Sequence, residues 1–158
     1  MTSEHTIGVG GWLVRAGGEV CLVRMTYGPA AGRLMIPGGH LDPGEALDAG
    51  ALREVAEETG IAARCDGLLM VRQRLLAPRA NLYLVFALSP CDDFAGRADR
   101  QEVSEVVWLT PRAVLARDDV QPIAAEVARA WLERRAVLAS RELDWQREPG
   151  YRLWSGAA

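Results

Sequence analysis

The chain begins with short apolar runs separated by turn residues. The runs at 6–14 and 20–25 flank a Gly-Gly pair at 17–18, which predicts two strands joined by a hairpin turn. A third short run, 34–36, ends where Pro37 begins a Pro-Gly-Gly segment. The first quarter of the chain is therefore predicted to be β-structure.

A different pattern follows. Residues 45–59 contain no proline and are rich in helix-forming residues, and Gly60 stands where a C-terminal cap belongs, so a helix is predicted there. The run at 82–88 is nearly all apolar, which is typical of a strand covered on both faces. Further strands are predicted over 68–76 and 103–109, with a polar loop at 90–101 between strands.

The C-terminal part is predicted to be helical. Thr110 is a suitable N-cap with Pro111 at the first helical position, and the spacing of apolar residues from Pro122 to about Ala139 predicts a longer helix. Strands on both sides of one central helix, with helices at the end, predict an α/β fold in which a mixed sheet lies between helices. We expect one domain over 1–158, with a helical and aromatic C-terminal extension from about residue 122.

Composition and charge exclude several classes of protein. The 158 residues carry a net charge of −3 with interspersed signs, so no basic field is available for a nucleic-acid polymer or a membrane surface. The N-terminus lacks signal-peptide features, and no apolar run is long enough for a membrane span. Cys21, Cys65 and Cys91 form no metal-ligand or paired spacing, so we interpret them as small core residues in a reducing cytoplasm.

Three glutamates crowd one face of the predicted central helix. Glu54 and Glu58 are four residues apart and Glu57 lies three residues after Glu54, so all three carboxylates share a narrow arc. Like charges at this spacing repel one another. A hard divalent cation over the face would explain them, and Gly50, one turn earlier, would leave open space for metal and phosphate. A solvated acidic face is the alternative for these glutamates alone.

The residues around these glutamates favour the interpretation that they bind a metal. The segment from Gly39 to Ile61 resembles the signature of the Nudix hydrolase family at every specified position. These positions are Gly39, Glu45, Arg53, Glu54, Val55, Glu57, Glu58, Gly60 and Ile61.

The resemblance implies an α/β/α sandwich and a Mg²⁺- or Mn²⁺-dependent pyrophosphohydrolase. It implies that Glu54, Glu57 and Glu58 hold the metal with the carbonyl of Gly38, while Arg53 and Glu45 orient the carboxylates. Family members often add an acidic residue from beyond this segment as a ligand or base. Glu102 is the first candidate and Glu105 the second.

Substrate and assembly are less constrained. We expect a nucleotide-derived small molecule, with Tyr27, Arg33 and Arg72 as candidate contacts, and ADP-ribose or a nucleotide sugar as the leading class. A house-cleaning nucleoside triphosphate pyrophosphohydrolase and a non-catalytic nucleotide sensor are the alternatives. The C-terminal tail is rich in aromatic residues, which either pack onto the domain or form a homodimer interface. These residues are Trp131, Trp145, Tyr151 and Trp154.

Overall fold

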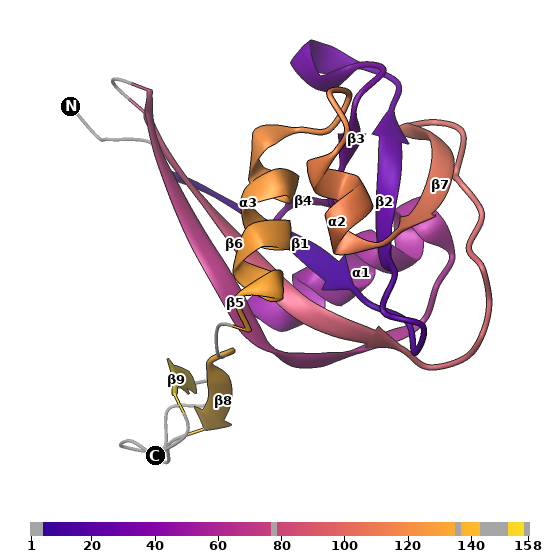
Figure 1. The fold of residues 1–158 in the computed structure, drawn as a ribbon. Helices are drawn as coiled ribbons and strands as arrows, with labels where there is room; N and C mark the ends of the chain where they lie inside the picture. Colours follow the sequence, from indigo (N-terminus) through magenta and orange to yellow (C-terminus); the bar gives the residue numbers. More distant parts are fainter. Residues whose placement is uncertain (1–4, 77–78, 135–136, 143–151, 157–158) are drawn as a thin grey trace.

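The computed structural model describes residues 5–76, 79–134, 137–142 and 152–156 (Figure 1). Its strands are β1 (His5–Leu13), β2 (Val20–Met25), β3 (Leu34–Met35), β4 (Gly38–His40), β5 (Ala63–Leu76), β6 (Arg79–Pro90), β7 (Val103–Leu109), β8 (Ala139–Glu142) and β9 (Arg152–Ser155). Its helices are the 3₁₀ turn η1 (Gly28–Ala30) and the α-helices α1 (Leu47–Thr59), α2 (Pro111–Leu115) and α3 (Pro122–Leu132).

The described strands form three sheets. The largest has the order β4-β1-β6-β5 and is mixed, because β1 and β6 are parallel whereas the other two pairings are antiparallel. A second, antiparallel sheet has the order β3-β2-β7, and β8 pairs with β9. Figure 1 shows the β5–β6 hairpin projecting beyond the rest of the molecule. The predicted mixed sheet is confirmed.

The two larger sheets lie between helices. On one side, α1 packs Ala51 and Val55 against Val9, Leu13 and other apolar residues of the strands. On the other side, α2 and α3 cover a second cluster built around Trp12 and Val85. Successive strand residues point to opposite faces, so β1 supplies side chains to both clusters. The predicted sandwich of helices around a sheet is therefore confirmed.

Local sequence signals set the helix ends. Gly60 has φ +70°, the left-handed conformation that a C-cap requires, and its N–H donates to the carbonyl of Ala56. The Thr110 hydroxyl accepts a hydrogen bond from the N–H of Ala113 at 3.2 Å, as the predicted N-cap requires. These ends agree with the predictions.

Three predictions are wrong in detail. Residues 38–40 were expected to end a strand but form β4, because the glycines allow close pairing with β1. The last helix ends at Leu132, not near Ala139, and Ala139 begins β8. Cys91 is exposed and Cys65 half-buried, so only Cys21 is a core residue, and none of the three forms a disulfide.

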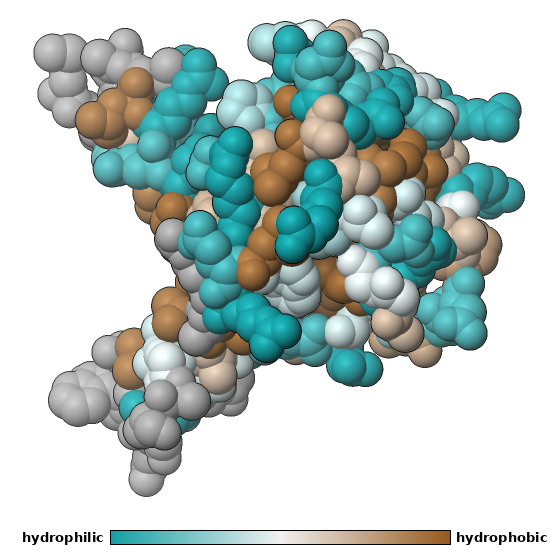
Figure 2. All heavy atoms as spheres, in the orientation of Figure 1, coloured by the Kyte–Doolittle hydropathy of each residue, from teal (hydrophilic) through white to brown (hydrophobic). Residues whose placement is uncertain are grey.

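The C-terminal aromatic residues that are described pack onto the protein. Trp131 packs against the cluster built around Trp12 and Val85. The ring of Trp154 meets that of Phe86 edge-on, with 5.1 Å between the ring centroids. Trp145 and Tyr151 lie outside the described residues. Figure 2 shows hydrophobic areas of the visible surface broken up by hydrophilic side chains. Among the helices that are described, none has the length and apolar character needed to cross a membrane.

Candidate active site

Helix α1 and strand β4 form the centre of the candidate site. Val55 and Ala51 anchor one face of α1 in the core, and the adjoining acidic face lies against β4. Gly39 allows the close approach, because a Cβ there would lie 2.6 Å from a carboxylate oxygen of Glu54. The helix and the glycine strand thus hold the carboxylates of α1 against the backbone of residues 38–40.

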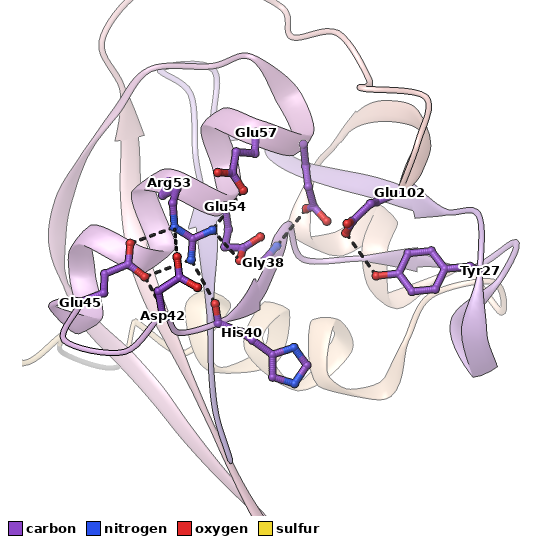
Figure 3. A network of polar contacts seen from close by, with 10 residues as sticks. Tyr27, Gly38, His40, Asp42, Glu45, Arg53, Glu54, Glu57 and Glu102 are labelled. Carbon is purple, nitrogen blue, oxygen red and sulfur yellow. Dashed lines mark hydrogen bonds and ion pairs between the residues drawn. The ribbon is translucent and has the colours of Figure 1, made fainter.

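Arg53 organises the acidic residues (Figure 3). Its guanidinium donates to both carboxylate oxygens of Glu45, at 2.9 and 3.0 Å, and also to Glu54 at 2.9 Å and Glu57 at 3.0 Å. A further hydrogen bond reaches the carbonyl of His40 at 3.1 Å. The hydrogen bonds to Arg53 hold the pKa of Glu45 below its usual range. Arg53 therefore connects the α1 carboxylates to the loop before the helix and to β4.

Glu58 is the most deeply buried of the acidic residues. Only 3% of its surface is exposed, and one carboxylate oxygen accepts a hydrogen bond from the N–H of Gly38 at 3.0 Å. Burial, together with the charges of Glu54, Glu102 and Asp99, raises the pKa of Glu58 to about 8. No cationic side chain among the described residues forms an ion pair with Glu58. A buried carboxylate without a cationic partner is suited to binding a metal cation from solution.

A second acidic group comes from the loop before β7. Asp99 accepts hydrogen bonds from the N–H groups of Gln101, Glu102 and Val103, which fixes the loop that carries Glu102. The Glu102 carboxylate lies 3.2 Å from the hydroxyl of Tyr27. Partial burial and the neighbouring Glu102 raise the pKa of Tyr27, so this hydroxyl remains a donor. The role of Asp99 in fixing this loop was not predicted, because the sequence of a polar loop does not show which carboxylate accepts hydrogen bonds from the backbone of the loop.

These groups line one cavity of about 300 Å³. Its walls are Tyr27, Gly38, Gly39, His40, Asp42, Glu54, Glu57, Glu58, Asp99 and Glu102. The structure therefore brings together Tyr27, Glu102, Gly38 and the three glutamates of α1, while Arg53 and Glu45 lie behind them. His40 belongs to β4 and forms part of the wall.

Other sequence candidates lie elsewhere. Arg33 donates to the carbonyl of Asp118 at 3.4 Å. Arg72 donates to Asn81, and its guanidinium lies 5.5 Å from the centroid of the Tyr83 ring. Neither arginine lines the cavity of the glutamates.

The fold also places Glu105 and Gly50, two further residues considered in the sequence. Glu105 forms an ion pair with Arg24 at 2.8 Å and does not line the cavity, whereas Glu102 does. The expectation that Gly50 leaves open space is wrong. A Cβ at Gly50 would lie 2.7 Å from Leu41 and 2.9 Å from Glu45, so this glycine allows close packing of the helix.

The residues fit a hard divalent cation in their chemistry. Carboxylate and carbonyl oxygens are the ligands that Mg²⁺ and Mn²⁺ prefer, and Mg²⁺ commonly takes only a few of them and keeps several water ligands. Within the described part of the chain, no three acidic, histidine or cysteine side chains converge as a ready-made coordination set. The reason lies in Arg53, which draws Glu54 and Glu57 toward itself, while Glu58 turns to Gly38.

Comparisons with known proteins agree with this arrangement. The NUDIX domain family is matched over residues 4–131. The chain is 31% identical over 134 residues to "Nucleoside diphosphate-linked moiety X motif 6" of Mus musculus, an alignment that covers 82% of this chain and 42% of the mouse protein. It is 35% identical over 115 residues to a "MutT-like protein" of Streptomyces ambofaciens, covering 72% of this chain and 69% of that protein.

Solved structures show the same fold. A NUDIX hydrolase from Nitrosomonas europaea superposes with a TM-score of 0.73 at 20% identity, covering 85% of this chain and 93% of that one. The chain spans less than half of the mouse protein that it resembles. The complete glutamate signature, the sandwich fold and the match over most of the chain together show that this protein belongs to the Nudix family.

Proposed function

We propose that this protein is a divalent-metal-dependent pyrophosphohydrolase that cleaves a phosphoanhydride bond in a nucleoside diphosphate linked to another group. The observation that carries the proposal is the cavity in which Glu54, Glu57, Glu58 and Glu102 meet the backbone of Gly38. Arg53 offsets part of the charge of Glu54 and Glu57, but Glu58 and Glu102 have no ion-pair partner among the described residues, so the excess negative charge favours a bound cation. An anionic diphosphate could enter such a space only with that cation present.

The glutamates of α1 are the proposed metal ligands. Glu54, Glu57 and Glu58, with the carbonyl of Gly38, would hold Mg²⁺ or Mn²⁺. When bound, such a cation neutralises diphosphate oxygens and lowers the pKa of a coordinated water. Family membership supports a divalent metal in general, and the choice between Mg²⁺ and Mn²⁺ is part of the proposal.

The remaining residues position groups and move a proton. Arg53 and Glu45 orient Glu54 and Glu57 through the hydrogen bonds described above. Glu102 is the proposed general base, because it lines the cavity without an ion pair to an arginine among the described residues. Tyr27 donates to Glu102 and would orient its carboxylate toward the attacking water.

The leading substrate class is ADP-ribose or a nucleotide sugar. Support comes from the names of the mouse relative and of a solved structure, a "UDP-X diphosphatase", which matches with a TM-score of 0.66 at 21% identity. The second candidate is nucleoside triphosphate hydrolysis. A "Putative 8-oxo-dGTP diphosphatase" of Bacillus subtilis is 32% identical over 76 residues, and these cover 48% of this chain.

A metal-dependent screen tests the proposal. The purified protein is incubated with Mg²⁺ or Mn²⁺ and with ADP-ribose, nucleotide sugars, dinucleoside polyphosphates or nucleoside triphosphates, and the products are identified. Two monophosphate products from ADP-ribose support the leading class, whereas pyrophosphate release from triphosphates supports the second. A lack of cleavage of every compound with both metals refutes the enzymatic proposal.

Matched variants test the roles of single residues. We expect Glu57→Gln to lower kcat by several orders of magnitude with an unchanged circular dichroism spectrum, since Glu57 is exposed enough to tolerate the change. Glu102→Gln should also lower kcat strongly. Glu105→Gln is its control, because it removes a nearby charge outside the cavity and should leave kcat within about threefold of wild type. Equal effects of the last two variants would refute the assignment of Glu102.

Three further expectations stay predictions. They are the single domain with its C-terminal extension, the cytoplasmic location and the homodimer.

A further inference from the structure

A second cavity adjoins the cavity of the glutamates. It has a volume of about 710 Å³ and is lined by Glu57, Gly60, Phe94, Arg97, Ala98, Asp99 and Arg100. Glu57 and Asp99 also line the cavity of the proposed metal ligands, so the two spaces share a wall. A molecule held at the glutamates could therefore extend past the end of α1 into this neighbouring space.

The acidic side chains that line this second cavity have bonding partners, whereas the basic ones do not. Glu57 is bonded to Arg53, and Asp99 is occupied by three backbone N–H groups of its own loop. Arg97 and Arg100, in contrast, form no side-chain hydrogen bond or ion pair with any described residue. Two exposed arginines without carboxylate partners among the described residues therefore line a cavity beside a site that we propose to bind a diphosphate.

The backbone presents these side chains in a defined way. The N–H of Arg97 donates to the carbonyl of Thr59 at 2.8 Å, which ties the loop to the end of α1. Arg100 has φ +64°, a left-handed conformation that is uncommon outside glycine, and its N–H donates to the carbonyl of Val103 at 3.0 Å. Residues in such conformations gather at ligand sites, because the surrounding structure must hold them there.

An aromatic ring completes the wall. Phe94 is 48% exposed, and its ring edge lies against Gly60, where an added Cβ would be 3.4 Å away. An exposed phenyl ring beside two arginines offers an apolar surface for a sugar or base and donors for an anion. The glutamate cavity differs, because none of its lining residues is an arginine and six of them are acidic.

We propose that this second cavity, defined by Phe94, Arg97 and Arg100, is a substrate subsite that binds an additional phosphate group located beyond the scissile diphosphate. The inference rests on the proposed function, and it narrows the substrate to compounds with more negative charge than a plain nucleoside diphosphate sugar. Such a phosphate could belong to a phosphorylated sugar, to a dinucleoside polyphosphate or to a nucleoside triphosphate. Arg97 and Arg100 would bind its oxygens through charged hydrogen bonds.

Paired substrates test the subsite. Steady-state kinetics with Mg²⁺ compare ADP-ribose with 2′-phospho-ADP-ribose and with ADP-ribose 1″-phosphate, and then with ATP and a dinucleoside tetraphosphate. We expect at least one phosphate-bearing compound to have a KM about tenfold or more below that of ADP-ribose. The compound that shows the preference identifies the source of the phosphate.

Two variants assign the preference to the cavity. Arg97→Met and Arg100→Asn should each raise KM for the preferred compound about tenfold, leave kcat unchanged and alter KM for ADP-ribose less than twofold. Asparagine tolerates the left-handed backbone at position 100, so Arg100→Asn removes the charge without new strain. Arg64→Met is the control, because it removes one positive charge from an arginine paired with Asp66 outside this cavity.

The outcomes separate the subsite from the proposed function. Cleavage of these compounds with equal KM values, or variants that keep the wild-type preference, would overturn the subsite and leave the hydrolase proposal standing. An effect of Arg64→Met equal to that of Arg97→Met would also overturn it, since net charge alone would then explain the preference. Absence of cleavage for every compound would overturn the hydrolase proposal itself.

Discussion

Burial of Glu58 leads to a prediction in which loss of function is accompanied by a gain of stability. Glu58 is 3% exposed, and its surroundings raise its pKa from an ordinary value of 4.5 to about 8. Between pH 4.5 and pH 8, therefore, Glu58 of the metal-free protein is protonated in the folded state but ionised in the unfolded state. Below about pH 4.5 Glu58 is protonated in both states, so its burial does not lower the free energy of unfolding. Above about pH 8 the destabilisation by its buried charge is complete.

The size of the effect follows from the shift. One pKa unit corresponds to about 1.4 kcal/mol, so the full shift would cost the metal-free fold about 4 kcal/mol at pH 8 and about 1 kcal/mol at pH 5. Local relaxation around a buried charge reduces these values. We therefore expect Glu58→Gln to stabilise the metal-free protein at pH 8 by at least about 2 kcal/mol, which corresponds to about 4–8 °C in Tm.

Thermal unfolding in the presence of a chelator measures this effect. Glutamine retains an oxygen that can accept the N–H of Gly38, so the variant keeps the local hydrogen bond. The Tm of the variant should exceed that of wild type at pH 8, and the gap should narrow toward pH 5. Addition of Mg²⁺ should raise the Tm of wild type more than that of the variant. A variant that is no more stable than wild type at pH 8 would refute the reasoning.

Two other predictions concern the core and the cysteines. Gly10→Ala should lower the free energy of unfolding by about 1–3 kcal/mol, because the added methyl group would overlap the hydroxyl of Tyr83. Urea denaturation measures the loss, and Tyr83→Phe should recover part of it; an undiminished stability of Gly10→Ala would contradict the close packing. In the native protein, a thiol reagent should modify Cys91 rapidly and Cys21 only after unfolding, since Cys21 is buried and burial raises its pKa to about 12. Mass spectrometry of the labelled peptides distinguishes the two, and early labelling of Cys21 would contradict its burial.

Local sequence rules account for the elements that were predicted correctly. The ends of α1 and α2 follow from Gly60 and Thr110, whose effects depend only on neighbouring backbone groups. The buried character of β6 follows from an apolar run that no exposed strand would carry. The strand over 38–40 was not predicted, because its glycines are typical of a turn and only their pairing with β1 makes them a strand. The last helix was predicted too long because the helical spacing continues past Leu132, whereas in the structure Arg134 takes a left-handed conformation with φ +54°, which ends the helix.

The sequence by itself determined the family, through the complete signature from Gly39 to Ile61. It also determined the acidic face of α1, because a helix of fixed pitch places residues 54, 57 and 58 on one side whatever surrounds it. The tertiary structure decided which of these carboxylates is buried, which Arg53 binds, and that Glu102 joins them while Glu105 pairs with Arg24. It also decided that Arg97 and Arg100 line a cavity beside Glu57. Burial, pairing and cavities depend on contacts between segments far apart in the chain, and no local pattern specifies which segments will meet.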